Sequence, residues 1–344
     1  MHETYGRPVK TVLGLLAAAM ALLLARPALA DTVQYDPGDT VYYTYCYAHP
    51  VAARIKPGDS VVTRTRDASN DVFSPSDKTF SAKIDFAKVN PQTGPFYVEG
   101  AEPGDTLVVH LDKIDLNRDW GWGASIPYFG ALGPEFKTMM VTPPAPDRLF
   151  IWHFDKGRNV AVLDVPNSKI GKIEVPLRPF FGTVGTAPAG KECISSLYPG
   201  PYGGNMDFRD VTEGVTLNFP VNEPGALLFL GDGHAAQGDG EIDGAAIETS
   251  FNVRFTVNLI KGKKIAWPHM ITDTEVMSIG STRPLIDALR IACTDMANWL
   301  NQDYGYEKYD AVELLGQTGK LKIANVVDPQ YSVSCGVDKK YLPQ

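Results

Sequence analysis

Two short stretches of the sequence alternate glycine with polar side chains, residues 203–207 (GGNMD) and residues 231–241 (GDGHAAQGDGE). Glycines allow tight turning and close approach of the backbone to a ligand, so the polar side chains between them can converge. In isolation His234 is equally well explained as a turn residue bonded to an aspartate. Its neighbours Gln237, Asp239 and Glu241 favour a functional role. The pattern predicts a site that binds a small polar molecule, holds a cation or moves protons.

Standard catalytic and metal-binding motifs do not explain this pattern. An EF-hand loop beginning at Asp239 would place Ser250 at position 12, where Ca²⁺ needs a bidentate glutamate. The sequence has no HExxH, GxSxG or P-loop motif, so the zincin, α/β-hydrolase and NTPase classes lack support. Asp239 and Glu241 still suit a hard cation through their oxygens. Asp67, after the run at residues 61–66, is either a further ligand or a turn-forming aspartate.

The elements that carry these residues are predicted to be strands joined by tight turns. Pro-Gly-Asp recurs at residues 37–39, 57–59 and 103–105, with a Pro-Gly variant at 224–225. Proline followed by glycine suits the centre of a type II turn, and each turn leads into a β-branched or apolar run. The pattern predicts β-sandwich or barrel-like parts of the jelly-roll type. Strands are predicted at residues 42–47, 61–66, 107–111, 159–163, 215–219, 227–230 and 251–260.

The helical signal lies near the C-terminus. One face of a predicted helix with Thr282 as N-cap carries apolar residues three or four positions apart: Leu285, Leu289, Ala292, Met296 and Trp299. A shorter helix is predicted at 309–315 and a last strand at 321–327. Segment 119–146, rich in glycine, proline and aromatic residues, is predicted to be a long loop lining a site, with a mobile insertion as the alternative. The fold class is therefore mainly β with a C-terminal helical pair.

The first thirty residues are typical of an export signal. Arg7 and Lys10 precede an apolar run at residues 12–25, and Ala28-Leu29-Ala30 follows before Asp31. A run of this length is too short to span a bilayer, which favours cleavage after Ala30 and a periplasmic or secreted protein. The predicted division is a signal peptide at 1–30, an N-terminal β-rich part at 31–156 and a C-terminal β-rich part at 157–344.

Composition excludes some partners. The chain has 32 Lys and Arg against 40 Asp and Glu, a net charge of −8, and no basic cluster. Nucleic acid is therefore not an expected partner, and neither is a membrane once the signal is removed. None of the four cysteines belongs to a CxxC pair, which excludes a zinc ribbon or thioredoxin motif. Disulfides in any of three pairings and buried thiols both remain open.

At these residues the sequence resembles the acetamidase/formamidase family. The resemblance is carried by GGNMD, GDGHAAQGDGE and the AIE that ends at Glu248. It extends back through residues 93–109 (TGPFYVEGAEPGDTLVV) and the His49-Pro50 region, and forward to residue 329. It implies a mainly β fold of two interlocked parts, a homo-oligomer such as a dimer, a divalent metal (Zn²⁺ or Ca²⁺), and hydrolysis of small aliphatic amides to a carboxylate and ammonia. Family members commonly have a histidine near the position of Asn90.

Amide hydrolysis requires an activated water, a stabilised oxyanion and a protonated leaving group. Under this resemblance Glu241 is the candidate general base, with Asp239 beside it in the catalytic set. Asn205, Gln237 and the backbone N–H groups of Gly203 and Gly204 are candidates for binding the carboxamide. The candidate metal or water-positioning ligands are Asp67, Asp207, His234 and Glu248.

Two alternatives remain open. Cys193 would be the nucleophile of a cysteine-type amidase, although the glycine-rich cluster would then have no role. A non-catalytic periplasmic β-protein could instead use the same scaffold to bind a small polar ligand, and Asn90 in place of the expected histidine favours that hypothesis.

Overall fold

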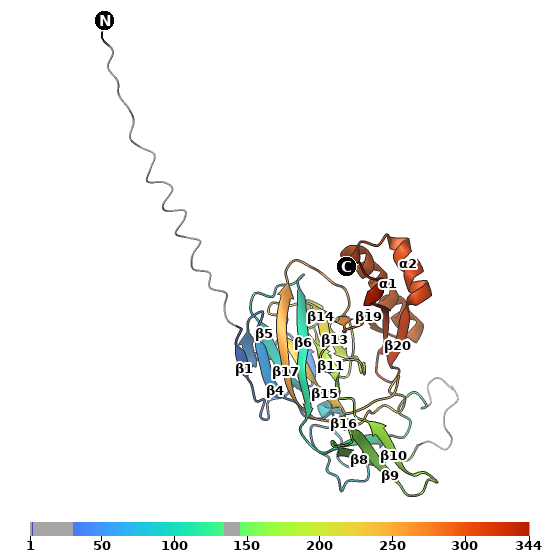
Figure 1. Ribbon diagram of the computed structural model, residues 1–344. Helices are drawn as coiled ribbons and strands as arrows, with labels where there is room; N and C mark the ends of the chain where they lie inside the picture. The colour runs from blue at the N-terminus through green and yellow to red at the C-terminus, as the bar shows by residue number, and fades with distance from the viewer. Residues whose placement is uncertain (1, 3–29, 134–144, 344) are drawn as a thin grey trace. The chain divides into compact units, whose positions relative to one another are not determined.

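The computed structural model describes residue 2, residues 30–133 and residues 145–343 (Figure 1). The predicted signal peptide lies outside the described residues except for His2 and Ala30. None of the helices in the described part has the length and apolar character needed to cross a membrane.

Within the described residues, nine strands form the first large sheet, sheet A. The pair β1–β4 is parallel and the other pairs are antiparallel. The strand order is β1 (Thr32–Gln34), β4 (Ser60–Arg64), β17 (Phe251–Ile260), β6 (Thr106–Leu116), β14 (Thr216–Pro220), β18 (His269–Ile271), β19 (Glu275–Thr282), β21 (Tyr331–Asp338) and β20 (Lys320–Asn325).

Sheet B has ten strands in the same part of the chain. Its main path is β10 (Gly171–Pro176), β9 (Val160–Val165), β8 (Arg148–Asp155), β7 (Trp120–Ser125), β16 (Glu248–Thr249), β15 (Leu228–His234), β11 (Phe180–Gly185) and β13 (Gly203–Asn205). β5 (Gln92–Val98) pairs with β15, and β3 (Ala53–Ile55) pairs with β5. A separate pair joins β2 (Thr44–Cys46) to β12 (Cys193–Ser195).

The two large sheets pack face to face around the main hydrophobic core. Phe96 of sheet B meets Phe255 of sheet A edge to face, with ring centroids 5.4 Å apart, and Phe181 meets Phe251 in the same way. β17 alternates buried and more exposed residues, as expected for a strand with one face in a sandwich core. β11 and β15 are buried along their whole length, so polar side chains on them must find partners inside the protein.

The helical pair consists of α1 (Leu285–Tyr304) and α2 (Lys308–Thr318). Ala292, Met296 and Trp299 of α1 pack with β19 and β21 in a second cluster, which confirms this part of the predicted apolar stripe, whereas Leu285 and Leu289 are only partly buried. Thr282 is not the N-cap, because β19 continues through it and Pro284 occupies the cap position. The described part of segment 119–146 is also not all loop, because Trp120–Ser125 forms β7.

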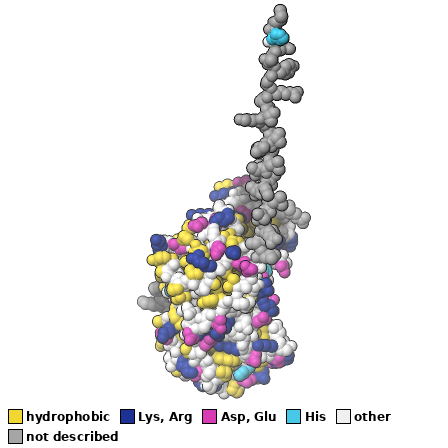
Figure 2. All heavy atoms as spheres, turned by 90° about the vertical axis from the view of Figure 1, so that its left-hand side faces the viewer, with side chains coloured by type: hydrophobic (Ala, Val, Ile, Leu, Met, Phe, Trp, Pro, Cys, Tyr) yellow, Lys and Arg dark blue, Asp and Glu magenta, His cyan; other side chains and the backbone are white. Residues whose placement is uncertain are grey.

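The predicted mainly β class with C-terminal helices is confirmed. The expected division of the chain at residue 156 stays a prediction; each large sheet draws strands from both sides of that residue. Figure 2 shows acidic and basic side chains interspersed over one face of the molecule, with apolar side chains between them.

Candidate active site

Five of the residues proposed from the sequence gather around one cavity. Asn205, Asp207, His234, Glu241 and Glu248 are all buried, and all five line a cavity of about 320 Å³. β13 delivers Asn205 and the turn after it delivers Asp207, while His234 ends β15 and Glu248 begins β16 beside it. The loop from 235 to 247 brings Glu241 back over the same cavity.

Gln237 determines which nitrogen of His234 faces the cluster. The Gln237 Nε2 group donates to the carbonyl oxygens of Asp207, at 2.8 Å, and Ala324, at 3.2 Å. Its Oε1 must therefore accept, and it lies 2.9 Å from His234 Nδ1. This network assigns the proton to Nδ1 and directs the Nε2 lone pair at the carboxylates.

Two carboxylates face that ring nitrogen. His234 Nε2 lies 3.3 Å from Asp232 Oδ1 and 3.3 Å from Glu248 Oε2. Within the described residues these two oxygens and Asp207 Oδ1 are buried without a hydrogen-bond partner. A lone pair facing carboxylate oxygens at this distance is repulsive unless a cation, either a proton or a metal ion, lies between them.

The donor set fits a divalent metal. Asp207, Asp232 and His234 offer ligand atoms within 4.8 Å of one another, as do His234, Glu241 and Glu248. One imidazole and several carboxylates form a hard-to-borderline site suited to Zn²⁺ or Ca²⁺. The absence of a side chain at Gly182 makes space for these carboxylates, because a Cβ atom there would lie 2.6 Å from both Asp207 Oδ1 and Asp232 Oδ2. A hydrogen bond from Nδ1 to Gln237 is the usual support of a metal-binding histidine.

The electrostatics of the cluster favour a bound cation as well. Burial raises the pKa of Asp207 well above its usual value, and the carboxylates of Asp328 and Asp232 add to the effect. Burial and Asp207 likewise raise the pKa of Glu241, and burial raises the pKa of Glu248 to about 7. Burial alone would lower the pKa of His234, but the neighbouring carboxylates of Glu248 and Asp232 outweigh it and hold that pKa well above the usual value. Without a metal, protons hold this cluster together.

Asn205 is committed to holding the carboxylates. Its Nδ2 donates to Asp207 Oδ2 at 3.0 Å and to Asp328 Oδ2 at 2.8 Å. Its Oδ1 accepts from Asn90 Nδ2 at 2.8 Å and from the Thr183 hydroxyl. All four hydrogen-bonding positions of the carboxamide are thus used, which favours a positioning role over the predicted binding of substrate.

The other residues predicted from the sequence do not line the cavity. Asp67 is fully buried and pairs with Arg118 Nη2 at 2.7 Å, while also accepting from Trp122 Nε1 at 3.2 Å. Asp239 is largely exposed and pairs with Arg209 at 3.0 Å. Neither is among the residues that line the cavity. The glycines at 203 and 204 are not cavity-lining residues either, and the N–H of the first donates to the carbonyl of Gly200.

The sequence interpretation left out three residues of the cluster. Asp232 lies inside the glycine-rich motif, but the sequence pattern assigns it no separate role. Asn90 was noticed as a departure from the family, and its Nδ2 also donates to Asp232 Oδ2 at 3.1 Å. Asp328 ends the resembling stretch near residue 329, and burial together with Glu241 raises its pKa well above the usual value.

Backbone conformation is a signal that the sequence does not display. Asn90, Asp207, Asp232 and Glu241 all have left-handed φ values, of 51°, 45°, 55° and 49°. Such conformations are uncommon outside glycine and gather at functional sites. Their concentration in one cluster supports a functional assignment.

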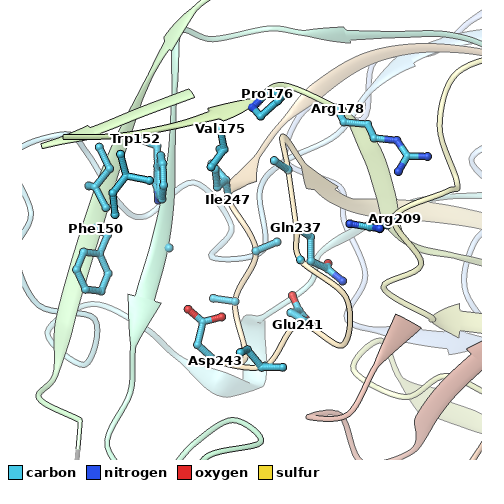
Figure 3. Close-up of a pocket in the computed structure, with 18 of the residues that line it drawn as sticks. Phe150, Trp152, Val175, Pro176, Arg178, Arg209, Gln237, Glu241, Asp243 and Ile247 are labelled. Atoms are coloured by element: carbon cyan, nitrogen blue, oxygen red, sulfur yellow. The ribbon is translucent and has the colours of Figure 1, made fainter. Parts of the chain in front are cut away.

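A second, larger cavity of about 670 Å³ is also lined by residues of the 235–247 loop (Figure 3). Apolar side chains of the β8–β10 strands, including Phe150, Trp152 and Val175, face Gln237 and Glu241 across it. Glu241 lines both cavities, but His234 and the converging carboxylates line the smaller one. The smaller cavity is therefore the candidate active-site cavity.

The cysteines form two disulfides, Cys46–Cys193 and Cys293–Cys335. Because the sulfur of Cys193 is bonded to Cys46, it is not available as the nucleophile of a cysteine-type amidase.

The fold and site together define a class: a mainly β protein with a buried carboxylate–histidine centre that lines a cavity. The sequence matches the profile of the Acetamidase/Formamidase family over residues 44–197 and 189–337, and the chain belongs to this family. The predicted enzyme class, an amidohydrolase, is confirmed by this membership and by the relatives.

Relatives in sequence and structure agree. An acetamidase of Mycolicibacterium smegmatis is 27% identical over 69% of each chain, and a formamidase of Methylophilus methylotrophus is 27% identical over 78% of this chain and 80% of its own. The crystal structure of an acetamidase from Yersinia enterocolitica superposes with a TM-score of 0.84 at 35% identity, over 93% of this chain and 96% of that one. For an acetamidase from Bacillus halodurans the TM-score is 0.80 at 32% identity, over 90% and 98%.

Proposed function

We propose that the chain is an exported amidase that hydrolyses small aliphatic amides to a carboxylate and ammonia with the help of a divalent metal ion. The observation that carries the proposal is the convergence of His234 Nε2 with buried carboxylate oxygens that make no hydrogen bond among the described residues. The relatives named as an acetamidase and a formamidase support formamide and acetamide as substrates.

Each buried residue of the cluster has a separate task in this proposal. The metal ion would be held by four residues: Asp207, Asp232, His234 and Glu248. When bound, it would lower the pKa of a bound water to roughly 7 and polarise the carbonyl group of the amide. Glu241 takes a proton from the attacking water and later passes it to the leaving nitrogen. Its raised pKa suits this role, because a base that must also act as an acid works best with a pKa near the working pH.

Export is supported by two independent features. The N-terminal thirty residues have the pattern of a cleavable signal, and the structure pairs all four cysteines in disulfides. Disulfides form and persist mainly in oxidising compartments such as the periplasm. The homo-oligomeric state, such as a dimer, stays a prediction that light scattering on the purified protein would test.

Ammonia release tests the proposal directly. We expect turnover of formamide, acetamide or propionamide, loss of that turnover with a chelator, and its return with Zn²⁺ or Ca²⁺. His234→Ala should abolish turnover, whereas the control His153→Ala, at an exposed position on β8, should retain it. A flat response to every amide and metal, with a ligand retained in the purified protein, would support the non-catalytic binding protein instead. Full turnover in the presence of chelator would reject the metal.

A further inference from the structure

The lining of the active-site cavity combines two kinds of side chain. The cluster around His234 supplies the polar lining, and four aromatic residues form what we call the aromatic wall: Phe80, Phe86, Trp122 and Phe129. Ring centroids of Phe80 lie 5.9 Å from those of both Phe86 and Trp122, so three members of the wall pack as a continuous series.

The aromatic wall is attached to the polar cluster at two points. Trp122 on β7 pairs through its backbone with Glu248, and its indole Nε1 donates to Asp67 Oδ2 at 3.2 Å, which fixes the ring. The ring of Phe129 lies against Gly244, where a Cβ atom would approach it to 2.3 Å. Gly244 follows Glu241 by three residues, so Phe129 packs against the loop that carries the candidate base.

Two members of the wall are also exposed to solvent. Phe86 is 53% exposed and Phe129 is 40% exposed, and both line the cavity. A single exposed aromatic residue is ordinary, but a pair lining a cavity beside a reactive centre is the pattern of an apolar recognition site.

The volume of the cavity also favours a ligand larger than the smallest amides. Formamide and acetamide contain only three and four heavy atoms, whereas a volume of about 320 Å³ lies at the lower end of the range for drug-sized ligands. A site shaped for the smallest amides would have little use for four aromatic rings in its lining.

We infer that this amidase prefers carboxamides with a bulky apolar acyl group, aromatic or branched, whose acyl part lies against the aromatic wall. The inference rests on the proposed function. The reaction is the addition of water to R–CO–NH₂: the new C–O bond forms, the C–N bond breaks, and the products are R–COO⁻ and NH₄⁺. The acyl group R takes no part in the chemistry, so its contribution is to binding and orientation.

A substrate series tests the inference. The metal-loaded enzyme is assayed by ammonia release with formamide, acetamide, isobutyramide and benzamide. Burial of each added methylene-sized group is expected to raise kcat/KM about 4-fold, which predicts isobutyramide about 15-fold above acetamide and benzamide higher still. Equal kcat/KM values, or a preference for formamide, would overturn the inference while leaving the proposed function intact.

Substitutions in the aromatic wall test whether it causes the preference for a bulky acyl group. Phe86→Ala and Phe129→Ala should each lower the ratio of kcat/KM for benzamide to that for formamide by about 10-fold, because each removes apolar surface from the acyl side. Tyr309→Ala is a matched control, since Tyr309 is an exposed aromatic residue on α2 that does not line the cavity. An unchanged ratio in both wall variants would refute the assignment.

Failure of all turnover would be a failure of the proposed function, and binding then decides the inference by itself. Titration calorimetry with benzamide should detect a complex with the unmodified protein, weakened in Phe86→Ala and unaltered in Tyr309→Ala. No detectable binding of benzamide would overturn the inference.

Discussion

Gly182 on β11 provides a sharp test of the metal centre. A Cβ atom at this position would lie 2.6 Å from Asp207 Oδ1, 2.6 Å from Asp232 Oδ2 and 2.7 Å from His234 Cε1, whereas real Cβ contacts below 3.0 Å essentially do not occur. In Gly182→Ala the two carboxylate oxygens must therefore retreat by about 0.4 Å or more, which approaches the tolerance of about 0.5 Å for a productive site. We expect metal affinity to fall about 10- to 100-fold and kcat/KM for acetamide to fall about 100-fold.

The control for this substitution is Gly238→Ala in the loop that carries Glu241. At Gly238 a Cβ atom meets nothing within 4 Å, so the same chemical change should leave the site undisturbed. Both variants are titrated with Zn²⁺ by calorimetry after chelation, and their folding is followed by circular dichroism. If Gly182→Ala folds and has metal affinity and kcat/KM within about threefold of the Gly238→Ala values, then the carboxylates and His234 do not form the metal centre, and the reasoning fails.

Three further predictions follow from the same geometry. Gln237→Ala removes the acceptor for His234 Nδ1 and should weaken metal binding about 10- to 100-fold, measured by calorimetry. Burial raises the pKa of the cluster's carboxyl groups above their unfolded values, so the metal-free protein should lose stability as pH rises from about 4 through the folded pKa values. The Tm of the protein in chelator should therefore be higher at pH 5 than at pH 8. A Tm that does not change with pH would contradict this. Asp67→Asn removes the 2.7 Å ion pair of the largely buried Arg118, which keeps only the more distant Asp71, at 3.4 Å, as a charged partner. It should lower the free energy of unfolding by about 3 kcal/mol, measured by denaturant titration, without changing metal content. Asp239→Asn should change the free energy of unfolding by less than about 0.5 kcal/mol in the same titration.

Much of the fold could be predicted from local pattern. The glycines of the recurring Pro-Gly turns, such as Gly58 and Gly104, have the positive φ that the turn requires, and the strands that follow them are present. β7 was missed because its alternating glycines resemble a loop. A Cβ at Gly121 would lie 2.7 Å from the carbonyl oxygen of Glu248, so this glycine permits close packing of strands and does not mark a turn.

The candidate site was predictable only where the chemistry is concentrated along the sequence. The glycine-rich stretch indicated His234 and Glu241 as candidates, and both line the cavity. Asp67 and Asp232 are both buried aspartates, and local sequence does not distinguish them. What distinguishes them is a partner far along the chain: Arg118 neutralises Asp67, whereas Asp232 faces other carboxylates and the imidazole. Long-range pairing of this kind is set by the register of β7, β15 and β16, which no short motif encodes.

The cluster makes little sense as a structural feature of the core. A buried polar atom without a hydrogen bond costs about 1–3 kcal/mol, and more if it is charged, while the whole fold is stable by only about 5–15 kcal/mol. Asp207, Asp232 and Glu248 each contribute one such oxygen among the described residues, and each of the three residues belongs to a possible ligand group that also contains His234. Apolar residues would fill that volume at lower cost. An arrangement that sacrifices stability in this way, on left-handed backbone at two of the three positions, is understandable if the oxygens exist to bind a cation that only the folded chain can hold.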